Sequence, residues 1–191
     1  SDTNSRAGKE VPIWKMEQRF VEPVKKVLAE RYEVDAHESL EDCLLNVAVT
    51  FVNDNYQDYL AELMEAKAGS LLEKLDEDNT RLQMLTALSY SVGYMLHIRS
   101  GLPGRAYFGN SLDKVCNFNT PEVISILGAA VSDMSEVLLR EIAVLVQDLQ
   151  REERNQNRTF EVPADSRYDV NRTATTEGSA EYGSDPPQGG R

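Results

Sequence analysis

One stretch of the chain decides its fold class: residues 120–154 read TPEVISILGAAVSDMSEVLLREIAVLVQDLQREER. Thr120 is a good N-cap, Pro121 suits the first helical position, and Glu122 places an acid in the first turn. From Leu127 onward, apolar residues return at steps of three and four, as along the seam of a coiled coil. We expect a single helix that ends near Arg154 and is about 50 Å long at about 1.5 Å per residue.

The apolar seam of this helix is the first candidate interface. A helix of this length exceeds what most small bundles need, so it either projects beyond the core or pairs with a second chain. We therefore predict that the seam binds a partner, through Leu127, Val131, Met134, Leu138, Ile142, Leu145 and Leu149.

Helical patterns also fill the chain upstream of residue 100. Apolar spacing predicts helices over 12–32, 40–68 and 80–98, with a short one from 70 to 76. Ser39 with Asp42 is a capping-box variant, and boxes at 70–73 and 80–83 predict further helix starts. The polar run 53–55 either breaks the second helix or forms its wet face. The sequence thus predicts an all-α fold: a helical bundle of about five helices with a long C-terminal helix.

Residues 100–119 are the irregular part of this bundle. Gly101, Pro103 and Gly104 punctuate the segment, and a short hairpin is one option there. Basic and aromatic residues cluster in it, in an otherwise acidic protein, and they form a candidate loop site: Arg99, Arg105, Tyr107, Phe108 and Lys114. Two interpretations stay open, because the aromatic residues either plug the end of the bundle or bind a partner.

Apolar residues are unevenly distributed along the chain. Only eight lie in residues 151–191, too few to build a core there. We expect a flexible N-terminal arm over 1–10, a helical bundle domain over 11–154 and an extended, irregular or disordered tail over 155–191. The tail carries spaced aromatic anchors for a partner: Phe160, Tyr168 and Tyr182.

The charge balance excludes several classes of function. Formal net charge is −12, whereas free-standing nucleic-acid binders carry a basic excess. No apolar run is long enough to span a bilayer, so we expect no membrane insertion. With two cysteines and no visible export signal, we expect a reducing compartment: the cytoplasm, or a larger intracellular or particle assembly.

The chain shows no recognisable catalytic or metal motif. Its two histidines and two cysteines are isolated, so we expect neither a metal site nor a cofactor. Cys116 and His97 form the only candidate nucleophile–base pair, and no third residue orients them. We favour the interpretation that Cys116 faces the core and that His97 lies at a helix end.

These observations favour a non-enzymatic protein that binds or assembles with other proteins. We expect a homo-oligomer or a protein partner docked through the last helix and the tail. One alternative is an acidic regulatory protein that masks a basic surface, as a nucleic-acid mimic does. A second alternative is a helical enzyme with an unrecognised site near His97, Arg99, Arg105 and Cys116.

Overall fold

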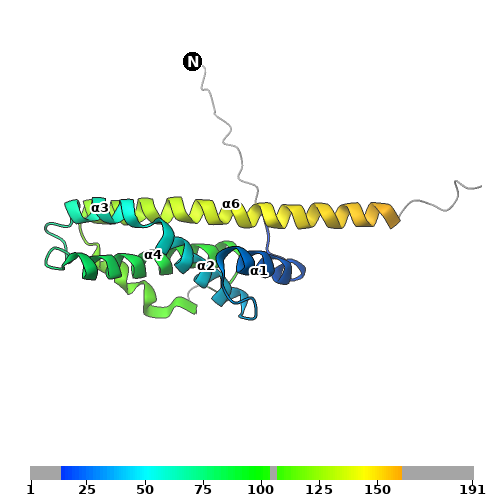
Figure 1. Ribbon diagram of the computed structural model, residues 1–191, viewed down its shortest axis with the longest axis horizontal. Coiled ribbons are helices and arrows are strands. Elements are labelled where there is room, and N and C mark those ends of the chain that lie inside the picture. The colour runs from blue at the N-terminus through cyan, green and yellow to red at the C-terminus, as the bar shows by residue number, and fades with distance from the viewer. Residues whose placement is uncertain (1–13, 104–106, 161–191) are drawn as a thin grey trace, which may run out of the picture. The chain divides into compact units, whose positions relative to one another are not determined.

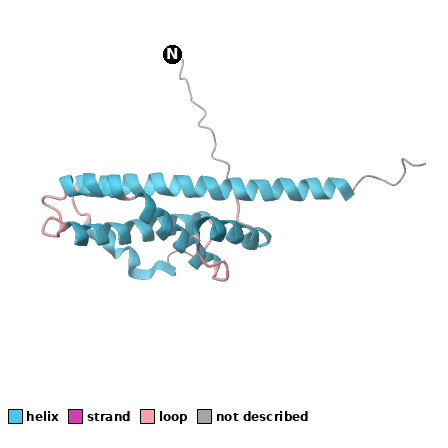
Figure 2. Cartoon of the chain, in the orientation of Figure 1, coloured by secondary structure: helices cyan, strands magenta, loops and turns pink. Residues whose placement is uncertain are grey.

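The structure of the protein, a computed structural model, is all-α over the residues it describes, 14–103 and 107–160. The chain divides into two units, residues 1–153 and 154–191, and the packing described below belongs to the first. Figures 1 and 2 show the helices and the turns that join them, with no strand in the described ranges. The elements in chain order are α1 (Gln18–Tyr32), α2 (Leu40–Asn55), α3 (Gln57–Ala66), α4 (Glu77–Arg99), the 3-10 helix η1 (Gly109–Asn117) and α6 (Pro121–Phe160). The predicted helical bundle with a long last helix is confirmed.

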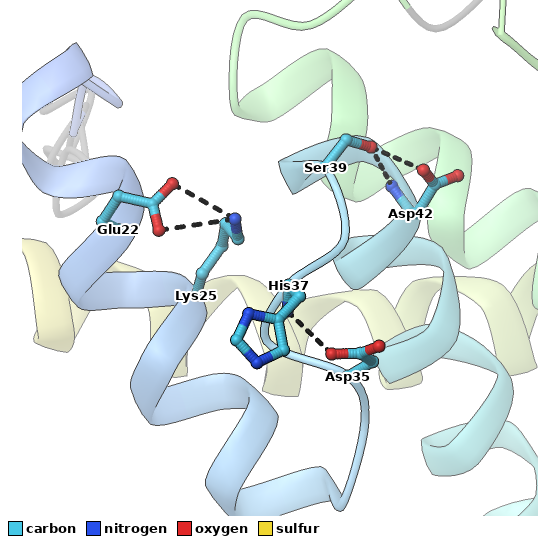
Figure 3. Close-up of polar contacts among 6 residues, drawn as sticks. All are labelled: Glu22, Lys25, Asp35, His37, Ser39 and Asp42. Carbon is cyan, nitrogen blue, oxygen red and sulfur yellow. Dashed lines mark hydrogen bonds and ion pairs between the residues drawn. The ribbon is translucent and has the colours of Figure 1, made fainter.

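Local polar contacts stabilise the start of α2 and the side chains of α1. The hydroxyl of Ser39 accepts a 3.1 Å hydrogen bond from the backbone N–H of Asp42 and donates one of 2.7 Å to its carboxylate, which confirms the predicted helix start (Figure 3). Within α1, Glu22 forms a 3.1 Å ion pair with the buried side chain of Lys25 (Figure 3). Pro23 lies inside α1, which begins at Gln18, several residues later than the sequence pattern suggested.

The turn before α4 differs from the prediction of a short helix over 70–76. The hydroxyl of Ser70 donates to the carbonyl of Lys67 at 2.6 Å and accepts from the N–H of Leu72 at 3.1 Å, which stabilises turns. Asp76 then caps α4 by accepting a 2.8 Å bond from the N–H of Asn79. The predicted start at residue 80 was therefore wrong, because an earlier side chain supplies the cap and Thr80 is buried inside the helix.

The segment after α4 contains η1 and no hairpin among its described residues. Phe108, which precedes η1, is buried against α4 at Gly93. A Cβ atom at Gly93 would lie 3.3 Å from Cζ of Phe108 and 3.0 Å from Cδ1 of Leu45. The missing side chain of this glycine therefore lets both residues approach α4 closely.

The core of the bundle is one cluster to which α1, α2, α3, α4 and α6 contribute. It holds Val24 and Leu28 of α1 and Leu44 of α2, all fully buried. In Figure 1, α6 lies alongside the other helices, and its buried residues continue to Val146. α6 ends at Phe160, six residues after the predicted end at Arg154, since no proline or glycine interrupts residues 155–160.

Candidate functional site

The inner face of α6 carries the predicted partner-binding seam, and the structure places that seam within the chain's own core. Four of its residues are buried: Leu127, Met134, Leu138 and Ile142. The other three, Val131, Leu145 and Leu149, are partly buried and pack against the same cluster. The 3–4 spacing therefore serves intramolecular packing, which leaves only other faces of α6 for contact with a partner.

Acidic side chains on α6 form hydrogen bonds and an ion pair with side chains of α1 and α3. Tyr32 donates a 2.7 Å hydrogen bond to Glu141, which also pairs with Arg31. Tyr59 donates a bond of 2.8 Å to Asp133. Burial, together with the bond to Glu141, raises the pKa of Tyr32. These pairs fix the rotation of α6 about its axis, so the face opposite the core is defined.

The outer face of α6 presents apolar side chains to solvent. Val137 and Val144 are 51% and 50% exposed. Because they are seven residues apart, they lie on the same side of the helix. Ion pairs flank them, Glu136 with Arg140 and Asp148 with Arg151. An apolar strip bordered by charges of both signs is typical of a helix that can pack against a further helix.

We did not single out these two valines from the sequence. The signal was present, because Val137 and Val144 are apolar residues that the seam spacing leaves out. Nearer the start of α6, Gly128 is exposed, and a Cβ atom added there would have nothing within 4 Å. A neighbouring helix would therefore meet little steric resistance at this glycine.

The predicted loop site is only partly assembled. Tyr107 donates a hydrogen bond to the carboxylate of Asp42 at the start of α2, while Phe108 is buried. Arg99 and Lys114 are exposed, and no ion pair involves either of them within 14–103 and 107–156. Arg105 lies outside the described residues. The aromatic pair therefore packs on the bundle, in line with the first of the two interpretations of this loop.

Phe108 packs against α4, and aromatic rings surround it. Tyr94 and Tyr90 meet it edge to face, with centroids 5.8 and 6.2 Å away. The ring of His97 lies 4.7 Å from Phe108 and 4.8 Å from Tyr107. Such edge-on contacts suit the opposite charges of ring edge and ring face. Tyr107 also contacts Phe108, with ring centroids 5.0 Å apart, so four rings surround Phe108 and form an aromatic cluster with it.

His97 is fully buried in this cluster, and its Nε2 atom lies 2.8 Å from the backbone carbonyl of Glu41. A carbonyl only accepts, so Nε2 carries the proton. Burial lowers the pKa of His97, which keeps the imidazole neutral near pH 7. The interpretation of Cys116 as core-facing was wrong, because it is exposed on η1. No hydrogen bond joins it to His97 among the described contacts, so the nucleophile–base pair is not assembled.

No protein-family model, no curated protein and no solved structure matches the sequence. Within the described ranges, His, Cys, Asp and Glu side chains form no group suited to a metal ion. In the same ranges, no helix is both long and apolar enough to cross a membrane. Of the predicted tail anchors, Phe160 ends α6 and its side chain is not described, while Tyr168 and Tyr182 lie outside the described residues.

Proposed function

We propose that the protein is a non-enzymatic interaction component that self-associates through the outer face of α6. The observation that carries this proposal is the exposure of Val137 and Val144 on one side of a helix whose opposite side is already packed. An apolar strip with a charged rim is the arrangement that protein–protein interfaces commonly have.

A second copy of the chain suits this face because its charges are mixed. Glu136, Arg140, Asp148 and Arg151 place both signs beside the two valines. In an antiparallel pair with two-fold symmetry, Val137 of one copy faces Val144 of the other, since the axis passes between residues 140 and 141. The same surface then serves both copies.

The experiment is a measurement of molar mass by light scattering over a range of micromolar concentrations, with the full chain. One chain has a mass of 21.4 kDa. We expect the wild type to exceed this mass as concentration rises, and the double variant Val137→Glu/Val144→Glu to remain at one chain. Buried charge without a partner would cost the dimer several kcal/mol in total, at about 2 or more for each glutamate.

A matched control replaces two exposed leucines away from α6. Leu71 and Leu82 are 64% and 60% exposed and lie before and within α4. The variant Leu71→Glu/Leu82→Glu should associate as the wild type does. A wild-type mass of one chain at every concentration would contradict the proposal, and so would equal loss of association in both double variants.

A further inference from the structure

His97 is a buried ionisable group that the proposed interface on α6 does not use. It lies near the C-terminus of α4, where its side chain reaches the first turn of α2. Nε2–H donates to the carbonyl of Glu41 at 2.8 Å. Nδ1 is buried and has no hydrogen-bond partner among the described residues. The imidazole thus has one nitrogen with a hydrogen-bond partner and one buried nitrogen without a partner among the described residues.

The rings of Tyr107 and Phe108 both contact the imidazole of His97. Their centroids lie 4.8 and 4.7 Å from the imidazole centroid. The hydroxyl of Tyr107 donates a hydrogen bond to the carboxylate of Asp42. Phe108 packs into the space that Gly93 leaves free on α4. Two side chains that precede η1 therefore shield the histidine from water.

We propose that His97 is a proton-sensitive latch: its neutral imidazole holds the Tyr107–Phe108 pair against α4, and a proton gained at Nδ1 releases that pair. The added N–H would have no acceptor in its buried position, and the ring would carry a charge that only water can solvate. Release of the two rings admits water to Nδ1. It also uncovers the apolar surface of α4 around Gly93.

Other ionisable groups near the imidazole affect the balance between its neutral and protonated forms. On α2, the charges of Glu41 and Asp42 favour the protonated ring, while burial disfavours it more strongly. Tyr107 stays neutral, because burial and its bond to Asp42 raise its pKa. The bonds from Tyr107 and Ser39 lower the pKa of Asp42, so this carboxylate remains ionised while His97 titrates. We therefore assign the added proton to His97.

The sign of the effect follows from the direction of the shift. His97 has a lower pKa when it is covered than the ordinary 6.5, so the uncovered form binds the proton more tightly. The covered form is favoured above pH 6.5 and loses that advantage as pH falls toward the lowered pKa. One proton changes the ratio of open to covered forms by at most about tenfold per pH unit.

Hydrogen exchange of the full chain between pH 7.5 and 5.0, corrected for the intrinsic exchange rate, tests the latch. We expect protection of amides 107–117 to fall as pH decreases, by up to about tenfold per unit. Amides 130–146 of α6 should keep their protection. In His97→Gln, whose side-chain amide can still donate to Glu41, protection of 107–117 should not depend on pH.

The matched control is His37→Gln, since His37 is the other histidine of the chain and is exposed. It should behave as the wild type does. The proposal is overturned if His97→Gln shows the wild-type pH dependence, if wild-type protection is constant, or if α6 loses protection in parallel. NMR titration of the His97 Cε1–H signal in the wild type needs no variant, and a midpoint at or above pH 6.5 would also overturn it.

Discussion

Tyr59 of α3 donates a 2.8 Å hydrogen bond to Oδ2 of Asp133 on α6. This bond is the largest contribution that raises the pKa of Tyr59, to about 12, and burial adds to it. Because the folded value lies above the ordinary 10, the stabilisation is complete below pH 10 and is lost as pH rises through 12. We expect the urea midpoint to decrease across that interval.

Tyrosinate absorbance at 295 nm checks the assignment. The difference between the wild type and Tyr59→Phe should titrate near pH 12. In Asp133→Asn this difference should titrate closer to 10, because the amide removes the negative charge beside the phenol. Asp148→Asn removes an acid of the same helix that pairs with Arg151 and serves as the control. A difference titration near pH 10 in the wild type would refute the prediction.

Two positions on α6 that are two residues apart should differ strongly in how much truncation destabilises the fold. Ile142 is 0% exposed in the core, whereas Val144 lies on the outer face. We expect Ile142→Ala to lower the free energy of unfolding by about 2–5 kcal/mol, because it leaves a cavity. Val144→Ala should change it by less than about 0.5 kcal/mol when measured at concentrations where the chain is a monomer. Equal losses in urea titrations would mean that the seam is not the core face of α6.

The two glycines of α4 and α6 form a second contrast. Gly93→Val should destabilise the fold by about 1–3 kcal/mol, since Leu45 and Phe108 already occupy the space that a side chain needs. Gly128→Ala meets nothing within 4 Å and should stabilise α6 by about 0.5–1 kcal/mol. Thermal unfolding followed by circular dichroism measures both. A stabilising Gly93→Val would show that Phe108 does not pack against α4.

The N-cap of α2 should contribute measurably to stability. Ser39→Ala removes the acceptor for the N–H of Asp42 and should cost about 1 kcal/mol in urea unfolding. Ser39→Thr keeps the hydroxyl and should recover most of that loss. If both variants lose the same amount, the hydroxyl is not what caps the helix.

The sequence predicted those features that depend on local chemistry. The starts of α2 and α6 follow from Ser39 and from Thr120–Pro121, whose caps act within one turn. The start of α4 was misplaced because Asp76 and Thr80 both resemble N-caps, and only packing decides between them. Periodicity also found the seam of α6 without revealing what covers it, since an intramolecular core and a coiled-coil interface share the same spacing.

The contacts of the candidate site were beyond sequence reasoning for a different reason. Tyr107 and Asp42 are 65 positions apart, as Tyr59 and Asp133 are 74 apart, and no local rule joins residues at such separations. The aromatic residues of the loop site were found by composition, while nothing in the sequence placed them against Tyr90 and Tyr94 of α4. The acids of α6 that bind tyrosines were indistinguishable from solubilising charges, because the chain has 32 acidic residues.

Because one cysteine is buried and the other is exposed, a thiol reagent should modify the native chain at a single position. Cys43 is fully buried, and burial raises the pKa of its thiol to about 11, so it stays unreactive at neutral pH. Cys116 is exposed on η1, only a few residues beyond Phe108. A maleimide dye would therefore attach at one place without any mutation. Cys116 lies on the 3-10 helix that follows the Tyr107–Phe108 pair, so the fluorescence of the dye would report movement of this segment.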